Sequence, residues 1–150
     1  MQAIVLVGIQ AVGKTSFFKE RFFETHVRIN LDMLRTRHRE RLLVEACLAA
    51  KQPFVADNTH ASIEARQRYI HRVKAARFEI VGYYFQSKLR DAIARNAQRS
   101  GKARIRDAGL RATYAKLEIP TRSEGFDQLF YVELSSVDGG FSVKEWEDEI

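Results

Sequence analysis

The sequence predicts an α/β domain whose parallel sheet carries helices on both faces. Short apolar or β-branched runs alternate with longer helical segments along the 150 residues, which is the spacing of right-handed βαβ units. The first run, residues 3–7, is apolar throughout, as in a strand buried on both faces. Ligands of such sheets bind beyond the carboxyl ends of the strands, so we search for a site in the residues that follow each strand.

The first half of the chain supplies three expected strands, each followed by a helix. The strands are residues 3–7, 26–30 and 53–57, and the helices are residues 14–24, 31–51 and 62–76. Pro53 fits the first position of its strand because no ladder hydrogen bond is lost there. Ser62 fits the N-cap of the third helix.

Helical spacing predicts which side chains of these helices face the core. The expected apolar faces are Phe17, Phe18, Phe22 and Phe23 on the first helix, Leu34, Leu42, Leu43, Ala46, Cys47 and Ala50 on the second, and Ile63, Tyr69, Ile70 and Val73 on the third. The side chains expected in solvent are Arg37, Arg39, Glu40 and Arg41 on the second helix, and Arg66, Arg68, Arg72 and Lys74 on the third.

The second half continues the alternation. Residues 78–85 are rich in aromatic and β-branched residues and predict a fourth strand. A helix is expected from about Ser87, a basic loop over 99–104, a helix over 107–117 and a last strand over 128–134. We therefore expect one domain over residues 1–150, with its core in 3–134. Residues 135–150 form a turn-like segment and an acidic tail, which we expect to pack through Phe141 and Trp146.

Composition indicates a soluble, cytoplasmic protein that has no membrane partner. No apolar run approaches the roughly 18 residues of a membrane span, and the first residues lack the charged region and cleavage site of a signal peptide. The single cysteine, Cys47, excludes an internal disulfide framework and fits a reducing compartment. Its apolar neighbours predict a core residue rather than a catalytic thiol.

The net charge of +6 conceals an uneven distribution. Residues 124–150 hold eight acids and one base, for a net charge of −7, so residues 1–123 hold 24 bases and 11 acids, for a net charge of +13. Solvated helix faces account for many of these bases. A field of this sign nevertheless favours a polyanionic substrate over a neutral metabolite.

The most informative motif follows the first strand and reads Gly8-Ile-Gln-Ala-Val-Gly-Lys14-Thr15. It matches the pattern G-x-x-x-x-G-K-[ST] between a strand and a helix, which is the phosphate-binding P-loop. Glycines let the backbone N–H groups turn toward phosphate oxygens, and the next helix adds the positive end of its dipole. Lys14 can reach the β- and γ-phosphates, and the Thr15 hydroxyl can ligate Mg²⁺. The residues expected to bind the nucleotide here are Gly8, Gln10, Ala11, Val12, Gly13, Lys14, Thr15 and Ser16.

Asp32 and Arg35 follow the second strand and stand three residues apart at a helix start. This spacing predicts that both side chains face the cleft. A carboxylate there can accept the proton of an attacking hydroxyl in phosphoryl transfer. The alternative is that Asp32 only caps the helix. Arg35 could direct a phosphate of the acceptor or pair with Asp32.

Asp57 ends the third strand, in the run Phe54-Val-Ala-Asp57-Asn-Thr59. An apolar strand ending in aspartate has the form of a Walker B carboxylate, which holds Mg²⁺ directly or through water. Asp57 could instead orient the Thr15 hydroxyl or Asp32.

A basic segment follows the fourth strand and contains Arg95, Arg99, Lys102, Arg104 and Arg106. Phosphoryl transfer needs cations around the migrating group, and a glycine-hinged loop can bring them in while it excludes water. The alternative is a solvated basic loop.

These stretches together resemble the kinase domain of 5′-hydroxyl polynucleotide kinases, the nucleic-acid end-healing enzymes. The resemblance rests on GIQAVGKTSF, VRINLDMLR, VADNT, ARNAQRSGKA and PTRSEGFDQL, in that order, and covers roughly residues 3–134. The chain also resembles related bacterial P-loop kinases of the AAA-type ATP-binding, zeta-toxin-like group. The resemblance implies an adenylate-kinase-like sheet of five parallel strands in the order 2-3-1-4-5, with a basic lid.

The resemblance also implies roles for the matching residues. Lys14 and Thr15 would bind the phosphates of ATP, or of another nucleoside triphosphate, together with Mg²⁺. Asp32 would be the general base and Arg35 would bind the phosphate next to the acceptor's 5′-OH. The remaining assignments are Asp57 and Thr59 at the acceptor, Asp57 also in the water shell of the metal, and Arg95 and Arg99 at the nucleotide, with Arg99 catalytic.

This chain departs from the family in the loop itself, where Ala11 and Val12 stand at positions that usually carry glycine and a small residue. Ala11 lacks the freedom of glycine and Val12 is stiff. Because the loop uses only backbone N–H groups there, we expect binding to survive.

We therefore expect a Mg²⁺-dependent kinase that transfers the γ-phosphate of a nucleoside triphosphate to a 5′-OH end of RNA or DNA. Its catalytic residues would be Lys14, Asp32 and Arg99. Its expected partners, besides the nucleic acid, would be phosphatase or ligase activities. Two alternatives stay open. One is a P-loop kinase that acts on a small molecule, and the other is a nucleotide-binding regulatory module that catalyses nothing.

Overall fold

The computed structural model describes residues 1–135 and 139–148 and contains one mixed sheet. Its strands are β1 (Gln2–Val7), β2 (Val27–Ile29), β3 (Phe54–Asp57), β4 (Glu79–Phe85), β5 (Gln128–Leu134) and β6 (Phe141–Glu145). The helices are α1 (Lys14–Arg21), α2 (Leu31–Leu34), α3 (Arg37–Ala50), α4 (Ile63–Ala75), α5 (Leu89–Ala97) and α6 (Asp107–Lys116), with short 3-10 turns η1 (Gly101–Ala103) and η2 (Arg122–Glu124).

The strand order is β2-β3-β1-β4-β5-β6, and the first five strands are parallel. The predicted fold class and the order 2-3-1-4-5 are thus confirmed. The sixth strand was not predicted: β6 pairs antiparallel with β5 at the sheet edge, within the segment expected to be an acidic tail. Residues 136–138 of the expected turn and the last two residues of that tail lie outside the described residues.

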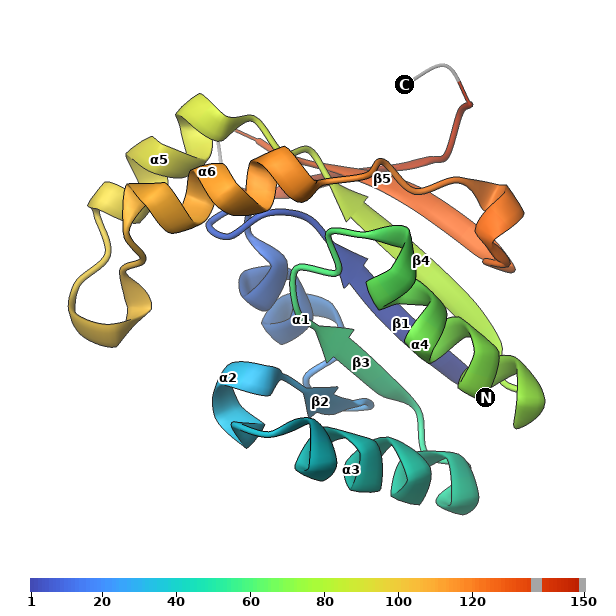
Figure 1. Ribbon diagram of the computed structural model, residues 1–150. Coiled ribbons are helices and arrows are strands. Elements are labelled where there is room, and N and C mark those ends of the chain that lie inside the picture. Colours follow the sequence, from blue (N-terminus) through green and yellow to red (C-terminus); the bar gives the residue numbers. More distant parts are fainter. Residues whose placement is uncertain (136–138, 149–150) are drawn as a thin grey trace.

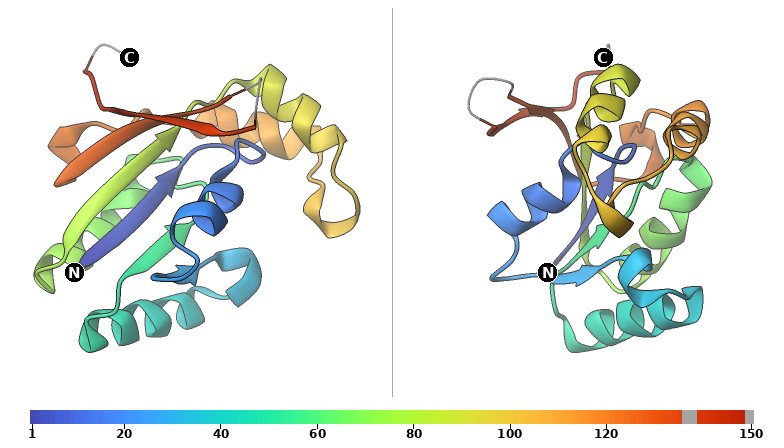
Figure 2. Two further views of the ribbon diagram at one scale, coloured as in Figure 1. Left: turned by 180° about the vertical axis from the view of Figure 1, so that it is seen from behind. Right: turned by 90° about the vertical axis from the view of Figure 1, so that its left-hand side faces the viewer.

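Helices cover both faces of the sheet, as Figure 2 shows in its edge-on view. One core cluster joins β1 side chains such as Val5 to α3 and α4 through Cys47 and Ile70. The other joins β1 side chains such as Leu6 to α1 and α5 through Phe17 and Ala92. The doubly covered β1 is accordingly buried from Ala3 to Val7.

The carboxyl ends of β1, β3 and β4 point to one edge of the molecule (Figure 1), where the loop after β1, helix α2 and the pair α5 and α6 gather. The register places Leu6 of β1 beside both Asp57 of β3 and Tyr83 of β4. Residues that follow different strands therefore meet there, as the fold class requires.

The helix expected over 31–51 is two helices. Arg35 adopts φ 76°, which ends α2, and the Thr36 side chain caps α3 by accepting a hydrogen bond from the backbone N–H of Arg39. Left-handed backbone cannot continue a right-handed helix. The expected N-cap Ser62 is confirmed, because its side chain accepts from the backbone N–H of Ala65.

Several expected exposures are wrong. Phe23 and Leu42, expected in the core, are 68% and 50% exposed, and Ile63 is also exposed. Arg66 and Glu40, expected in solvent, are buried. Both charged residues lie on the buried stripe of their helices, where each has a partner: Arg66 pairs with Glu124 and Glu40 with Arg37. The predicted packing of Phe141 and Trp146 is confirmed by their ring contacts with Phe17 and Tyr84.

Candidate active site

The loop after β1 has the backbone form of a phosphate cradle. Gly8, Ala11 and Gly13 adopt φ values of 157°, 61° and 98°, and α1 begins directly after Gly13. Ala11 thus takes the left-handed conformation in spite of its side chain. Val12 is 3% exposed and packs in the core that lies under α1.

Neighbouring elements fix this loop from three sides. The backbone N–H of Gly8 donates to the Thr59 carbonyl at 3.0 Å, and that of Ile9 donates to Ser87 Oγ at 3.2 Å. Arg95 of α5 donates to the Ala11 carbonyl at 3.2 Å. The loop is therefore held before any ligand arrives, and two of these contacts come from Thr59 and Arg95, which sequence reasoning had marked as site residues.

Lys14 lies folded into the loop. Its Nζ donates to the carbonyls of Gly8 and Ile9 at 2.8 and 2.5 Å, and the residue is 8% exposed. Burial lowers the pKa of Lys14 to about 8, the Asp57 carboxylate opposes this, and the charge of Arg99 adds to it. Arg99, the expected lid arginine, is therefore within electrostatic reach of Lys14.

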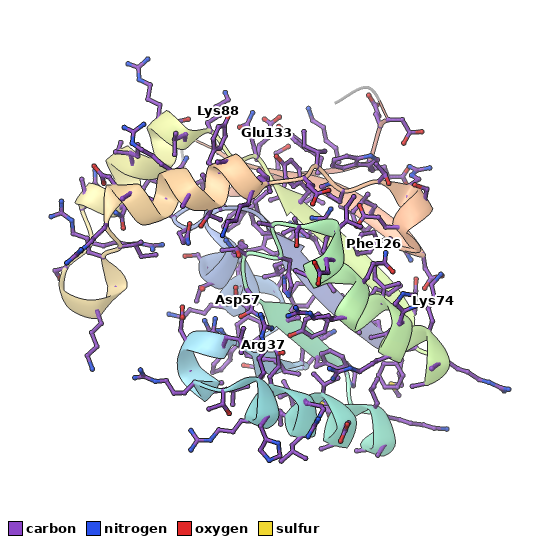
Figure 3. All side chains as sticks on the ribbon, in the orientation of Figure 1. Arg37, Asp57, Lys74, Lys88, Phe126 and Glu133 are labelled. Carbon is purple, nitrogen blue, oxygen red and sulfur yellow. The ribbon has the colours of Figure 1, made fainter. Side chains whose placement is uncertain are left out.

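Thr15, Asp57 and Arg28 form a cluster at the base of the loop. Asp57 is 2% exposed, and its Oδ2 accepts from Thr15 Oγ1 at 3.0 Å and from Arg28 Nε at 2.9 Å. Figure 3 shows Asp57 at the end of β3 on the side of α2, away from Lys74 and Phe126. The alternative that Asp57 orients the Thr15 hydroxyl is thus realised.

Asp32 and Arg35 differ from this cluster in being exposed. Asn30, not Asp32, caps α2, because its Oδ1 accepts from the backbone N–H of Met33 at 3.0 Å. Arg35 lies beyond the last residue of α2, so the two do not share a helix face as expected. In the described part of the chain neither side chain forms a hydrogen bond or an ion pair.

Two asparagines tie this region to β3. Asn30 Nδ2 donates to the Asp57 carbonyl at 2.6 Å, and Asn58 Oδ1 accepts from the backbone N–H of Leu31 at 2.9 Å. The start of α2, which carries Asp32, is therefore fixed relative to Asp57.

The basic segment is a loop between α5 and α6, which pack against each other (Figure 1). Fully buried Asn96 closes the loop, since its amide bonds both the N–H and the carbonyl of Ile105. Arg104 and Arg106 are exposed and line a pocket of about 440 Å³ with Gly101, Ile105 and Asp107. Arg99 is exposed and donates to the Ala103 carbonyl at 3.4 Å.

The two remaining residues predicted to bind the nucleotide are Gln10 and Ser16. Gln10 Nε2 donates to Thr113 Oγ1 of α6 at 3.0 Å. Ser16 is exposed on α1.

Sequence reasoning did not assign Arg28, Asn96 or Ser87 to the site. Arg28 carried a signal, because a charge inside a short strand of a parallel sheet needs a partner. His60 is buried after β3, and its Nδ1 lies 2.6 Å from the Leu6 carbonyl. Burial lowers the pKa of His60 to about 4, so the ring is neutral at pH 7.

Comparison with known proteins identifies the family of this chain. Residues 37–120, more than half of the chain, match a protein family described as an AAA domain. The chain belongs to this AAA domain family. The match includes Asp57, Arg95 and Arg99 and begins after the loop of Gly8–Thr15. A comparison with curated proteins finds no match.

Solved structures similar to this AAA domain confirm the P-loop kinase fold. Kti12 of Chaetomium thermophilum, in complex with ADP-AlF3, is 16% identical with a TM-score of 0.64, and 91% of each chain is covered. A gluconokinase of Sinorhizobium meliloti 1021 is 18% identical with a TM-score of 0.62, covering 90% of this chain and 83% of that one. A structure from the PezAT toxin-antitoxin system of Streptococcus pneumoniae is 14% identical with a TM-score of 0.61, covering 93% and 69%.

The family, the fold and the preformed loop together establish a P-loop kinase-like nucleotide-binding domain. Within residues 1–135 and 139–148, no helix is long and apolar enough to cross a membrane.

Proposed function

We propose that this domain is a Mg²⁺-dependent polynucleotide kinase, which transfers the γ-phosphate of ATP or another nucleoside triphosphate to a 5′-OH end of RNA or DNA. The observation that carries the proposal is the state of Asp32. This carboxylate is exposed at the start of α2, tied to Asp57 through Asn30, and unpaired within the described residues. An exposed carboxylate that has no partner of its own is suited to accept a proton.

The donor half supports the same chemistry. Lys14 and Arg99 bring positive charge to the loop, which is what a transferring phosphoryl group requires. Thr15 and Asp57 offer two hard oxygen donors whose atoms lie 3.0 Å apart. The described residues hold no cluster of three or more His, Cys, Asp or Glu side chains that could hold a metal. This donor set fits Mg²⁺, which is usually bound through one or two protein oxygens together with phosphates and waters.

In the proposed reaction the oxygen of the acceptor 5′-OH forms a bond to the γ-phosphorus. The bond from that phosphorus to the β–γ bridging oxygen breaks, and the nucleoside diphosphate leaves. Asp32 accepts the proton of the hydroxyl, and Lys14 and Arg99 stabilise the charge on the transferring group. When bound, Mg²⁺ would supply further neutralisation of the phosphate oxygens. Arg35 would bind the phosphate next to the 5′ end.

The charge of the domain supports a nucleic acid as the acceptor. Residues 1–123 carry a net charge of +13, and Arg104 and Arg106 are exposed beside the pocket of the basic loop. Exposed arginines suit phosphate groups, and binding of a polyanion would depend steeply on salt.

The experiment is a transfer assay with γ-labelled triphosphate, offered in parallel to 5′-OH RNA, 5′-OH DNA, the same oligonucleotides with a 5′-phosphate, and a panel of sugars and gluconate. We expect label on the 5′-OH ends only, with an acceptor KM that rises steeply with salt. Label on a sugar or on gluconate would contradict this proposal and indicate a kinase that acts on a small molecule.

A kinase that acts on a small molecule is the second candidate. A gluconokinase and a sugar kinase of Janibacter sp. HTCC2649 share this fold, the latter at 16% identity with a TM-score of 0.58, covering 87% of this chain and 85% of that one. A domain that binds nucleotide but labels no acceptor in the panel would instead be a regulatory module.

A further inference from the structure

Arg28 is the one charged residue of β2, and it reaches into the base of the phosphate loop. Its Nε lies 2.9 Å from Asp57 Oδ2, and its Nη2 lies 3.4 Å from Thr15 Oγ1. The side chain is 28% exposed, whereas the Asp57 side chain is 2% exposed. One guanidinium therefore contacts both side chains that are suited to hold Mg²⁺.

These contacts engage the same two side chains that a metal site would use. The Thr15 hydroxyl has one proton, which it donates to Asp57 Oδ2 at 3.0 Å. Arg28 Nη2 can therefore only donate to a lone pair of Thr15 Oγ1. A hydroxyl oxygen has two lone pairs, so a metal ion ligated by Thr15 would take the second one and lie beside the positive charge of Arg28.

Asp57 also needs a cation of its own. A buried carboxylate without a partner is strongly unfavourable. Arg28 forms its ion pair, while Lys14, the other cation close to Asp57, donates to the carbonyls of Gly8 and Ile9. Arg28 is thus the group that neutralises Asp57 in the nucleotide-free protein.

We propose that Arg28 is a tethered cation that holds the Thr15–Asp57 pair in the nucleotide-free state and leaves it when the metal–nucleotide complex binds. Arg28 then sets the Mg²⁺ concentration at which the domain becomes competent to bind nucleotide. The proposal rests on the Mg²⁺ requirement of the proposed function and is independent of the acceptor. It makes Arg28 a positioning residue whose removal eases loading with metal and destabilises the metal-free protein.

The test compares Arg28→Gln and Arg28→Lys with Arg41→Gln, a control that removes a charge from the exposed face of α3, far along the chain from the loop. Binding of a non-hydrolysable ATP analogue is titrated by calorimetry at a series of Mg²⁺ concentrations, and thermal melting is recorded in EDTA and in Mg²⁺. We expect Arg28→Gln to lower the Mg²⁺ midpoint about tenfold, because a repelling unit charge is removed from the site. Arg28→Lys should give a smaller decrease, and Arg41→Gln none.

Melting provides the readout that is independent of binding. We expect Arg28→Gln to melt at a lower temperature than the wild type in EDTA, and to regain most of the difference when Mg²⁺ and the analogue are added. A midpoint that is unchanged or raised in Arg28→Gln would overturn the proposal.

A measurement on the wild type covers the case in which Arg28→Gln does not fold. In protein labelled with ¹⁵N-arginine, the Nε–H signal of Arg28, assigned with Arg28→Lys, should be protected from exchange in EDTA and lose that protection with Mg²⁺ and the analogue. A signal that stays protected would refute the release of Arg28. Because none of these readouts needs phosphoryl transfer, failure to label any acceptor would count against the proposed function alone.

Discussion

The proposed donor and acceptor halves of the site are built in opposite ways. In the donor half, Lys14, Thr15 and Asp57 are each held by hydrogen bonds to neighbouring elements. In the acceptor half, Asp32 and Arg35 are exposed and have no side-chain partner in the described chain. The donor half is therefore ordered by contacts within the protein before phosphates arrive, whereas the acceptor half has free groups that only a substrate would engage.

The donor half depends on a scaffold that lies outside it. Fully buried Arg66 of α4 forms two hydrogen bonds with Glu124, at 2.7 and 3.1 Å, and donates to the carbonyls of His60 and Ala61. These carbonyls follow Thr59, whose own carbonyl holds Gly8. The pair thus joins the loop after β3 to η2 and supports the phosphate loop from below.

The largest expected effect comes from breaking this scaffold. Arg66→Met should lower the free energy of unfolding by about 3–5 kcal/mol, because Glu124 is left buried without its cation. Urea unfolding measures this loss. Arg68→Met is the control, because the Arg68 side chain is half exposed and its contact with Glu64, at 4.0 Å, is a long surface ion pair. The double variant Arg66→Met with Glu124→Leu should recover part of the loss. A loss below about 1 kcal/mol, as for a surface ion pair, would show that the scaffold is dispensable.

A smaller effect should follow from filling the phosphate loop itself. Gly13 has φ 98°, and a Cβ on it would lie 2.9 Å from the Phe141 ring of β6. Gly13→Ala should cost about 1–2 kcal/mol for the left-handed backbone and more for the contact. Gly101→Ala, at φ 60° with open space around it, gives the backbone cost alone.

The difference between these two alanine variants therefore measures how tightly β6 packs on the loop. Adding Phe141→Ala to Gly13→Ala should reduce the difference. Equal unfolding free energies for the two variants would mean that β6 does not press on the donor half.

The smallest effect is a pH dependence that only the donor half should show. Burial lowers the pKa of Lys14 from 10.5 to about 8 in the nucleotide-free protein. Above pH 8 nucleotide binding must therefore include uptake of a proton by Lys14, and affinity should fall by up to about tenfold per pH unit. Calorimetry in buffers of different ionisation enthalpy measures the proton uptake, and Lys14→Met should abolish it.

The lowered pKa of Lys14 has the opposite effect on the free energy of unfolding. Between pH 8 and 10.5 the unfolded chain keeps Lys14 charged while the folded chain does not, so the unfolded state binds more protons and the contribution of Lys14 to stability rises with pH. Affinity and stability should therefore move in opposite directions across this range. Parallel changes would place the pKa of Lys14 elsewhere.

The position of the phosphate loop could be predicted from sequence because its pattern is local. Gly8, Gly13, Lys14 and Thr15 stand within eight residues, and Asp57 follows an apolar strand. The sequence predicts Arg66 and Glu40 in solvent, although each falls on the apolar stripe of its helix, with Ile70 and with Val44 respectively. A charge on such a stripe indicates a buried partner, but the partner of Arg66 is 58 residues away, and one sequence does not identify it.

The edges of the structure were harder to predict for a related reason. Phe141 and Val143 alternate with polar residues, which is the period of a half-buried strand, but the acidic residues around them favoured a tail. The split between α2 and α3 depends on the positive φ of Arg35. An arginine in a sequence does not predict that conformation. Neither feature follows from local propensity, because pairing with β5 and the cap at Thr36 decide them.

The central claim is that Asp32 serves the acceptor and not the nucleotide, and Asp32→Ala tests it most directly. Transfer of labelled γ-phosphate to a 5′-OH oligonucleotide and the Kd for ATP should be measured on the same preparation, with melting as a check of folding. We expect transfer to fall about 10²–10⁴-fold, the contribution of a general base, while the Kd and the melting temperature stay unchanged. Transfer at the wild-type rate, or a loss of ATP binding equal to the loss of transfer, would contradict it.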